Sequence, residues 1–540
     1  MPKKLDKNNA IAQFMLNVEK NPQLTFIKKI QKERKDAKIY LVGGMIRDLS
    51  LGKLSKDYDM VITGIPPKKL HDVLKKLGTV NLVGKTFGVF KLRPKLQATS
   101  YKLQADIDIA LPRTEHPFGT GGYRDVEVQS DYRLPIEKDL ERRDFTINAM
   151  ALELELRIKN QELRITDPFK GIEDLKDKII RCVGNPNERF AEDYSRMLRA
   201  LRFSVQLGFT IEEKTWKSIV KNIKNINKKN VKCQKSSVKC NEYIVPREII
   251  AKELFKMFAI DPVASLKILD ESGMLELLMP EFIKMKKCSQ PKQFHSEGDV
   301  WEHTMLALNF LNSKKFRREF PIPNSQPASP AGRFPNKTQN SISYKLKAIS
   351  YNELVWALLF HDLGKPYTMT KTDRIRFNEH DMVSSKLFTE ISNRLKLSSA
   401  GLDTEKTKKI IEKHMILTHG NIENMKETTV EKYFFNDQFP GTELIMHSFC
   451  DVSATVPPSG KPDFTKYKLL KKRIASLKSK VKAKRDLPPD ILDGNEIMKI
   501  LKIPSGKIIG EIKEYLRELQ LRGKITTKEE AKKKLIKQYK

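Results

Sequence analysis

The sequence contains few cysteines and no long apolar run. Five cysteines are spread over 540 residues, and this odd, sparse set does not support a disulfide framework. Cys233 and Cys240 lie too far apart for the close pair of a zinc knuckle. The longest buried-looking run, LVWALLF, is far too short for a membrane span, and the N-terminal MPKKLDKNNAIAQF lacks the apolar core of a targeting peptide. We therefore expect a cytoplasmic protein without a membrane partner.

Acidic residues are also in short supply. The chain has 67 Asp and Glu against 101 Lys and Arg, which gives a formal net charge of +34. Such a surplus favours a polyanionic partner, most simply nucleic acid, although a lysine-rich genome would produce the same bias. Hydrophobic residues make up 39% of the chain, so ordinary cores can form, and the length allows roughly three to five domains.

The pattern of apolar residues changes along the chain. From KIYLVGG to MALELEL, short apolar runs alternate with turns, as in an α/β domain, whereas the chain after ITDPFKGIEDL is predominantly helical. Residues 312–345 are rich in Pro, Ser, Asn and Arg and are predicted to be disordered. The segment KPDFTKYKLLKKRIASLKSKVKAKR predicts a basic, exposed helix.

Paired aspartates begin one apolar run of the α/β region. In KDYDMVITG, Asp57 and Asp59 are one residue apart, so on a strand both side chains project from the same face. Two adjacent carboxylates repel each other unless a cation lies between them, although a polar turn before a strand would also have this sequence. A further alternating pair, Asp106 and Asp108, occurs in QADIDIALPR, and we expect Asp108, or alternatively Asp106, to supply a third carboxylate.

Glycines and arginines accompany these carboxylates. In YLVGGMIRDLSLG an apolar strand runs into Gly43 and Gly44 before a helix opens, which lets the backbone approach phosphate closely. Arg47 lies on that helix. In EKDLERRDFTINAMALEL, Arg142, Arg143 and Asp144 precede a half-apolar segment that bears Asn148. The arginines and Asn148 are candidates for holding phosphate or sugar groups, although a salt-bridged helix start would also have this sequence. Arg113 in LPRTE is a candidate triphosphate contact.

Four long motifs occur in one order: LVGGMIRDLSLG followed by KDYDMV, DLERRDFTINAMAL, ITDPFKGIEDLKDKIIRCVGNPNERFAEDYSRMLRALRF, and VPREIIAKELFKMF. The chain thereby resembles a class II tRNA nucleotidyltransferase, the group that includes CCA-adding enzymes and bacterial poly(A) polymerases. The resemblance implies Mg²⁺ at Asp57 and Asp59, with tRNA, ATP and CTP as partners and no obligate protein partner. It also leaves poly(A), A-only or CC-only addition open.

The segment RFAEDYSRMLRALRF has a pattern that favours base selection. Phe190, Tyr194 and Leu201 share one helical face, and Asp193 and Arg196 are neighbours on another, with Arg199 further along. A carboxylate accepts from the amino group that cytosine and adenine share, and a guanidinium donates to the ring nitrogen beside it. Uracil and guanine reverse this order. In the family this motif acts as an amino-acid template, although a surface salt bridge would have the same spacing.

Histidines and aspartates recur in the C-terminal half. Imidazoles and carboxylates suit a divalent transition metal, and an adjacent His–Asp pair at the end of a buried helix needs neutralisation. The set resembles an HD-superfamily phosphohydrolase, which implies a second metal (Ni, Mn or Mg) and phosphatase or 2′,3′-cyclic phosphodiesterase activity. The ligands by that resemblance are His303, His361, Asp362 and Asp451, extended by His380 and His414.

The expected fold class is α+β, with a mixed nucleotidyltransferase head followed by all-α domains. A metal-dependent phosphohydrolase with an RNA-binding head is the alternative of another class. The predicted segments are an N-terminal extension (1–35), the head (36–155), a nucleotide-selecting neck (156–225), a tRNA-binding body (226–290), an HD domain (291–460) with the insert 312–345, and a basic helical tail (461–540).

Overall fold

The structure, a computed structural model, is mixed α and β and divides into two compact units. One unit covers the described residues up to Leu278, and the other covers those from Met279 onward. The structure describes residues 24, 26–53, 58–83, 89–94, 107–123, 125–155, 164–230, 242–321, 351–419, 422–483 and 489–539. Among these residues, no helix combines the length and the apolar character that crossing a bilayer requires.

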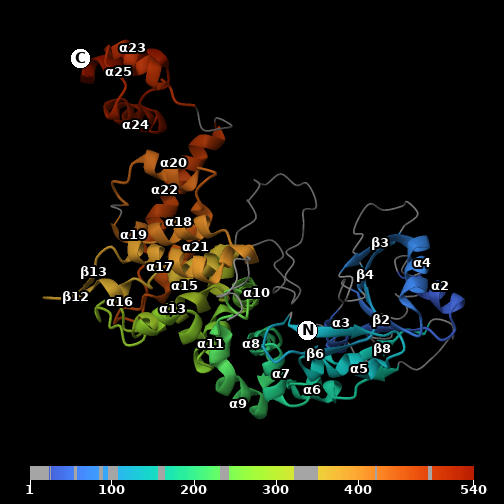
Figure 1. The fold of residues 1–540 in the computed structure, drawn as a ribbon. Helices are drawn as coiled ribbons and strands as arrows, with labels where there is room; N and C mark the ends of the chain where they lie inside the picture. The colour runs from blue at the N-terminus through green and yellow to red at the C-terminus, as the bar shows by residue number, and fades with distance from the viewer. Residues whose placement is uncertain are drawn as a thin grey trace. The chain divides into compact units, whose positions relative to one another are not determined.

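A seven-stranded mixed sheet forms the head of the first unit (Figure 1). Its order is β3-β4-β5-β2-β1-β8-β9, and β2 and β5 run parallel while the other neighbours are antiparallel. The strands are β1 (Lys38–Val42), β2 (Asp59–Thr63), β3 (Gly78–Val83), β4 (Val89–Pro94), β5 (Ile107–Ala110), β8 (Ala151–Glu153) and β9 (Ile165–Thr166). The central strands β1 and β2 are buried on both faces beyond their first residue, which explains why their sequences are nearly continuous apolar runs.

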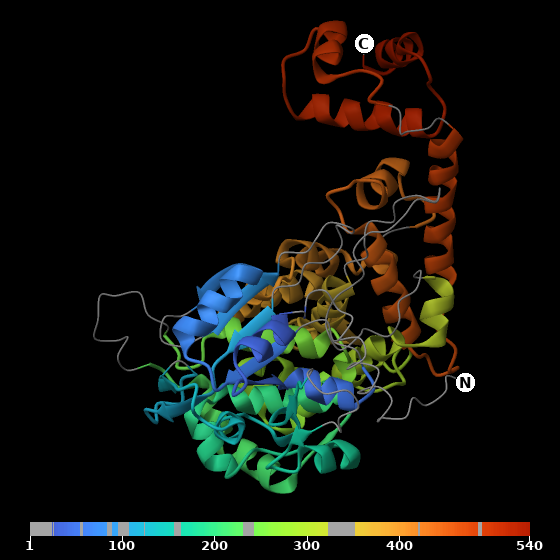
Figure 2. The same ribbon diagram turned by 90° about the vertical axis from the view of Figure 1, so that its right-hand side faces the viewer.

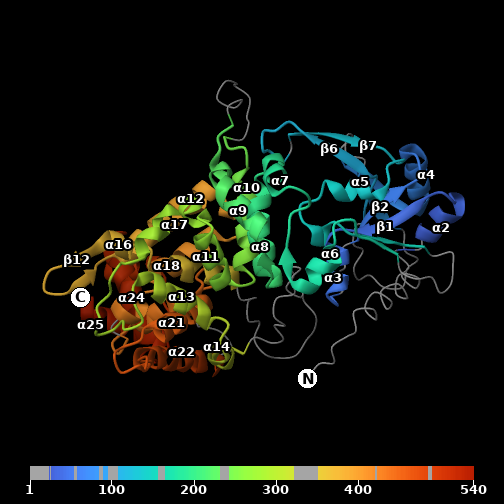
Figure 3. The ribbon, with the colours of Figure 1, turned by 90° about the horizontal axis from the view of Figure 1, so that it is seen from below.

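Helices and one hairpin complete the head. One sheet face packs on α5 (Ile136–Glu141) through a cluster that includes Tyr40, Val61 and Leu140. The hairpin β6 (Arg113–Pro117) and β7 (Val126–Ser130) forms a separate two-stranded sheet, with β6 beside α5 (Figure 3). The remaining head helices are α2 (Phe26–Glu33), α3 (Gly44–Ser50) and α4 (Pro67–Leu77).

The end of the predicted N-terminal extension is part of the head. Phe26, Ile27 and Ile30 on α2 are almost fully buried, and the Gln31 side-chain amide donates to the Leu154 carbonyl at 2.6 Å. The earlier part of the extension lies outside the described residues. The apolar stripe of FIKKIQKE was therefore a packing signal within a charged segment.

Helices continue the first unit after the sheet. They are α6 (Gly171–Asp177), α7 (Pro186–Glu192), α8 (Ser195–Leu207), α9 (Glu213–Asn222), α10 (Arg247–Phe258), α11 (Pro262–Glu271) and α12 (Met274–Leu278). One short parallel pair, β10 (Ile179–Ile180) with β11 (Thr210–Ile211), lies among them. The α8 helix packs against α10 and α11.

Among its described residues, the second unit is helical apart from the short hairpin β12 (Met369–Lys371) and β13 (Ile375–Phe377). Its first helices are α13 (Val300–Phe310), α14 (Lys314–Glu319), α15 (Tyr351–Phe360), α16 (Lys365–Thr368), α17 (His380–Leu395), α18 (Thr404–Lys413) and α19 (Ile416–His419). They are followed by α20 (Glu427–Phe434), α21 (Gly441–Ala454), α22 (Thr465–Ala483), α23 (Gly494–Leu501), α24 (Lys507–Leu521) and α25 (Lys528–Tyr539). In Figure 2 the last three, drawn in red, pack on one another around their own apolar core.

The predicted disordered insert 312–345 is wrong at its start, because residues 314–319 form α14. Ser313 caps this helix by accepting from the Phe316 N–H at 3.0 Å. Phe316 is 2% exposed and packs against Phe320 and Phe449. An aromatic anchor inside a polar, basic sequence therefore orders the first part of the insert; residues 322–345 lie outside the described residues.

Candidate functional sites

Two carboxylates meet on neighbouring parallel strands of the head. Asp59 is the first residue of β2, and its register partner across the sheet is Asp108 on β5. Partners in register project from the same sheet face, so these carboxylates lie side by side. The Lys91 ammonium on β4 lies 3.6 Å from an Asp108 oxygen. Asp57 and Asp106 lie outside the described residues.

The glycine turn before α3 lets an arginine approach the backbone. Gly43 has φ 71°, and a Cβ there would lie 2.8 Å from Nη1 of Arg143. A larger residue at this position would therefore push Arg143 away, in addition to straining the backbone. The predicted strand, glycine turn and helix are all present, with β1 ending at Val42 and α3 opening at Gly44.

A chain of hydrogen bonds joins four of the predicted residues. Arg47 Nη1 donates to Asn148 Oδ1 at 2.9 Å, and Asn148 Nδ2 donates to Asp144 Oδ1 at 3.1 Å. The Nε of Arg199 donates to Asp144 Oδ2 at 2.9 Å. Burial alone would raise the pKa of Asp144, but Arg199 and the bond from Asn148 hold it well below its usual range.

A buried carboxylate lies behind the two consecutive arginines. Asp139 is 0% exposed, and its oxygens lie 2.7 Å from Arg142 Nη2 and 3.1 Å from Arg143 Nη2. Arg142 also pairs with Glu115 on β6 at 2.7 Å, and Arg113 pairs with the same Glu115 oxygen at 2.9 Å. Despite burial, which raises it, the pKa of Asp139 is lowered by the two guanidinium groups of Arg142 and Arg143.

The nucleotide-selecting segment is not one helix, as the spacing predicted, because Asp193 interrupts it. α7 ends at Glu192, Asp193 is extended, and α8 begins at Ser195. Asp193 Oδ1 accepts from the Ser195 backbone N–H at 2.9 Å and from its hydroxyl at 2.6 Å, a local bond that competes with helix continuation. Arg196 pairs with Glu192 at 2.5 Å rather than with Asp193. The simple salt-bridge interpretation of Asp193 and Arg196 therefore does not apply.

One pocket of about 390 Å³ collects most of the predicted residues. It is lined by Gly43, Gly44, Arg47, Asp59, Arg142, Arg143, Asp144, Asn148, Asp193, Arg196, Arg199 and Phe203. Phe203 was missed from the sequence; its ring contacts the Arg47, Arg199 and Arg202 guanidinium groups, the closest 3.9 Å from the ring centroid. Arg113 and Asp108 do not line the pocket.

The glycine-rich tip of the β6–β7 hairpin touches the turn that carries Asp193. The Gly121 carbonyl accepts from the Tyr194 N–H at 3.0 Å. A Cβ on Gly121, which has φ 81°, would lie 2.0 Å from the Tyr194 ring. The hairpin thus contacts Tyr194, the neighbour of the pocket residue Asp193, by its tip, and the pocket residue Arg142 through Glu115.

In the second unit, the predicted HD residues gather as two groups around Asp362. His303, His361 and Asp451 form the first group, with His303 Nε2 3.0 Å and His361 Nε2 3.7 Å from Asp451 Oδ1. Nε2 of His361 also lies 3.2 Å from Asp362 Oδ2 and has no hydrogen-bond partner among the described residues. A buried, unsatisfied ring nitrogen facing two carboxylates is the arrangement that a metal ion would complete.

The second group consists of His380 and His414, which lie near Oδ1 of Asp362. His380 Nε2 lies 3.3 Å and His414 Nε2 3.8 Å from Asp362 Oδ1, and the two ring nitrogens lie 3.1 Å apart. The Lys365 ammonium, which was not predicted, lies 2.7 Å from Asp362 Oδ2. Burial lowers the pKa of His414 well below its usual value, and the neighbouring His380 and His361 lower it further. Asp362 therefore lies between two sets of imidazoles.

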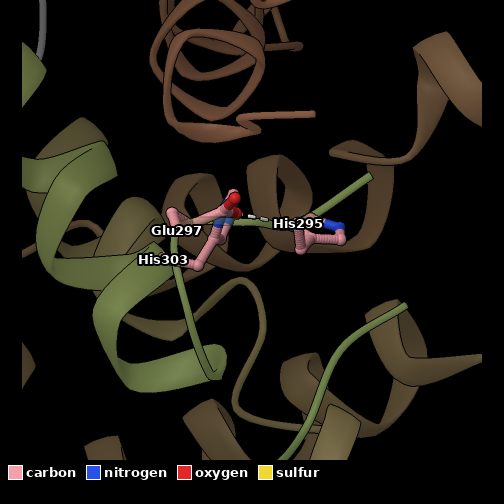
Figure 4. A group of neighbouring side chains, drawn as sticks. All are labelled: His295, Glu297 and His303. Carbon is pink, nitrogen blue, oxygen red and sulfur yellow. Dashed lines mark hydrogen bonds and ion pairs between the residues drawn. The ribbon is translucent and has the colours of Figure 1, made fainter. Parts of the chain in front are cut away.

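Three further residues of this region were missed. His447 is fully buried beside the His361 and His414 rings, with both nitrogens unpartnered among the described residues, and burial lowers its pKa to about 3. His295 and Glu297 form a third group with His303 (Figure 4). The pKa of His303 is about 9, because its bonds to Asp451 and Glu297 outweigh the cost of burying its charge. The H-x-E spacing of FHSEGDVWEH was the available signal.

Two family models match the chain. The poly(A) polymerase head domain matches residues 39–181, and the HD domain matches residues 342–437. A multifunctional CCA protein of Alcanivorax borkumensis is 30% identical over 362 residues, which cover 66% of this chain and 70% of the relative. An A-adding tRNA nucleotidyltransferase of Deinococcus radiodurans is 26% identical, covering 91% of this chain and 93% of the relative.

A solved structure shares the fold over nearly the whole chain. The Bacillus stearothermophilus CCA-adding enzyme in complex with CTP has a TM-score of 0.56 at 19% identity, covering 95% of both chains. The head sheet, the pocket and the matched domains together define the protein as a nucleotidyltransferase that carries an HD domain. The chain belongs to the family of CCA-adding tRNA nucleotidyltransferases.

Proposed function

We propose that the protein adds C, C and A from CTP and ATP to the 3′ ends of tRNA without a nucleic-acid template. One observation carries the proposal: Asp193 and Arg196 line the same pocket as Asp59 and the arginines. A base held at Asp193 therefore belongs to a nucleotide whose phosphates face basic groups and whose reacting end faces a carboxylate. The chain's net charge of +34 supports tRNA as the acceptor, and this substrate implies the cytoplasm as the site of action.

The metal of this reaction would be Mg²⁺, and Asp59 and Asp108, together with Asp57, would hold it. Carboxylate oxygens on adjacent strands suit a hard divalent cation, and Asp59 opens onto the pocket. When bound, such ions activate the attacking hydroxyl and neutralise charge on the triphosphate.

The chain's own residues position the nucleotide. Arg142 and Arg143 are held from behind by Asp139, so their remaining N–H groups can donate to phosphate oxygens. Asp193 has one oxygen held by Ser195. Its other oxygen accepts a hydrogen bond from the exocyclic amino group of cytosine or adenine, and Arg196 donates one to the ring nitrogen beside that group. Burial raises the pKa of Asp193, whereas the bonds from Ser195 and the nearby Arg196 act in the opposite direction.

Incubation with tRNA that lacks its 3′ end tests this proposal. With CTP and ATP together, we expect two cytidines followed by one adenosine, and with either nucleotide alone only the corresponding partial products. A single adenosine that requires tRNA ending in CC would indicate an A-adding enzyme like the Deinococcus relative. A long adenosine tail would indicate a poly(A) polymerase, and no extension at all would refute the proposal.

We further propose that the HD domain hydrolyses phosphate esters, as a phosphatase or a 2′,3′-cyclic phosphodiesterase. The clustering of four imidazoles around Asp362 and Asp451 supports this activity, and the donor set favours Ni²⁺ or Mn²⁺, with Mg²⁺ as the alternative. Asp362 can hold two ions because its oxygens face different histidines.

Two substitutions separate the activities. Asp59→Ala should abolish nucleotide addition and leave hydrolysis of 2′,3′-cyclic AMP or p-nitrophenyl phosphate unchanged, whereas His361→Ala should do the opposite. If Asp59→Ala left nucleotide addition intact, Asp59 would have no catalytic role in the head. If His361→Ala left hydrolysis intact, the HD cluster would have no catalytic role.

A further inference from the structure

The histidines of the HD cluster are oriented from behind by hydrogen bonds of their Nδ1 atoms. In three of the four, Nδ1 lies at bonding distance from the carbonyl of the residue three positions earlier. These contacts are His361 to Leu358 at 2.8 Å, His380 to Phe377 at 2.8 Å and His414 to Ile411 at 2.7 Å. A carbonyl only accepts, so Nδ1 carries the proton and Nε2 presents its lone pair to the cluster.

His303 is the exception among the four, because a side chain takes the place of the carbonyl. Its Nδ1 lies 2.9 Å from Oε1 of Glu297, while its Nε2 faces Asp451 Oδ1 at 3.0 Å. Glu297 precedes α13 and is not part of the helix that carries His303. Figure 4 shows its carboxylate beside both the His303 and the His295 rings.

The position of Glu297 is fixed independently of His303. Its Oε2 accepts from the Val456 N–H at 3.0 Å, and the neighbouring Ser296 N–H donates to the Val456 carbonyl at 2.7 Å. Val456 follows α21, the helix that carries Asp451. The carboxylate is therefore held against the end of the helix that supplies one ligand and bonded to the imidazole that supplies another.

The same oxygen of Glu297 also receives the second imidazole. His295 Nδ1 lies 2.6 Å from Oε1, and the two rings pack edge to face with centroids 5.2 Å apart. An ionised carboxylate only accepts hydrogen bonds, so this oxygen can receive an N–H group from each of the two rings.

We propose that Glu297 is a positioning residue of the HD centre, which holds His303 with Nδ1 protonated and Nε2 directed at the metal, without touching the metal itself. The inference rests on the proposed metal-binding function of the HD domain. A carboxylate behind a ligating histidine fixes the ring and raises its basicity, and losing it typically costs about 10–100-fold in metal affinity. Backbone carbonyls bond to Nδ1 of the other three histidines, and a substitution cannot remove a backbone carbonyl. Glu297 is a side chain, so its bond to His303 can be removed by mutation.

Titration of the metal-free, full-length protein with Co²⁺ in excess Mg²⁺ tests the proposal. The visible absorption of Co²⁺ reports imidazole ligands, and His361→Ala sets the background. We expect Glu297→Gln to weaken Co²⁺ binding about 10–100-fold. Asp299→Asn is the matched control: the Asp299 side chain caps the same helix by accepting from the Glu302 N–H, so the change removes a carboxylate charge at the start of α13 without altering a contact of the His303 ring.

Proton NMR of the Co²⁺-loaded protein supplies a readout that general destabilisation would not move. Each ligating histidine with a protected Nδ1–H gives one strongly shifted exchangeable resonance. Glu297→Gln should lose the His303 resonance by fast exchange and keep the three that carbonyls protect, whereas Asp299→Asn should keep all four. Unchanged affinity and spectrum in Glu297→Gln would overturn the role of Glu297 alone. Absence of Co²⁺ binding by the unmodified protein would overturn both this inference and the HD metal site.

Discussion

Replacing Asp139 with Asn should weaken nucleotide binding although Asp139 does not line the nucleotide pocket. Asp139 lies on α5 with its side chain completely buried, and it pairs with both Arg142 and Arg143, which do line the pocket. The substitution preserves the size and shape of the side chain. It removes only the charge and one of the two acceptor oxygens.

The magnitude follows from what each arginine loses. Apart from position 139, the acceptors of these two arginines among the described residues are Glu115 for Arg142 and the Asn148 carbonyl, at 3.4 Å, for Arg143. Breaking a fully buried ion pair costs about 3–5 kcal/mol, and a single orphaned polar group costs about 1–3 kcal/mol. Because both arginine side chains are 18–19% exposed and water can solvate them in part, we expect about 2–3 kcal/mol.

Thermal unfolding and steady-state kinetics together measure this effect. A loss of 2–3 kcal/mol should lower the melting temperature of the first unit by about 5–10 °C. Loss of about 1.4 kcal/mol of phosphate binding corresponds to about a tenfold rise in KM for CTP and ATP. Glu141→Gln on the same helix is the control, since Glu141 forms an exposed pair with Lys138 that is worth about 0.2–1 kcal/mol at most.

A wild-type KM in Asp139→Asn would refute the positioning of Arg142 and Arg143 from behind, even if the protein melted earlier. Equal effects of Asp139→Asn and Glu141→Gln would show that any change of charge on α5 acts on the pocket through its field. Only a rise in KM confined to Asp139→Asn supports the contact-based reasoning.

Three further substitutions test other contacts. Gly121→Ala should raise misincorporation of UTP and GTP, because its Cβ would lie 2.0 Å from Tyr194 beside Asp193, whereas Gly119→Ala, with similar φ and open space, should not. Asp144 has a lowered pKa, so its stabilising contribution is present above about pH 4 and is lost as pH falls, and Asp144→Asn should flatten the decline in melting temperature between about pH 5 and 3. Phe316→Ala should cost about 3–5 kcal/mol in urea unfolding of the second unit, and no cost would contradict the ordered start of the insert.

The sequence predicted best the residues whose signal lies within one short stretch of the chain. Gly43 and Gly44 follow a continuous apolar strand, and this local signal correctly placed the turn before α3. The boundary between α7 and α8 was missed because Asp193 fits a helical period, while its side chain bonds to the backbone two residues on. Periodicity reports which face is buried, and Phe190, Tyr194 and Leu201 are indeed buried, but it cannot report a single extended residue between two helices.

Residues that position the site residues without lining the site were not predictable in the same way. Asp139 is an ordinary acidic residue of a helix start, and only the fold reveals that its partners point into a pocket. Glu115 is distant in sequence from Arg142 and meets it because the β6–β7 hairpin lies beside α5. A sequence motif identifies positions where one residue type is required at a fixed spacing. A carboxylate that holds an arginine or histidine in place can come from any helix or strand that packs beside that side chain.

The two sites solve the same physical problem with a buried carboxylate. An arginine or histidine that must present one edge to a ligand has other N–H groups, and each N–H buried without an acceptor costs about 1–3 kcal/mol. Asp139 takes this role behind Arg142 and Arg143, and Glu297 takes it behind His303 and His295. In both places one carboxylate receives two cationic or donor groups, which fixes their relative orientation as well as their charge. Removing either carboxylate should therefore change how the facing groups bind before it changes whether the domain folds.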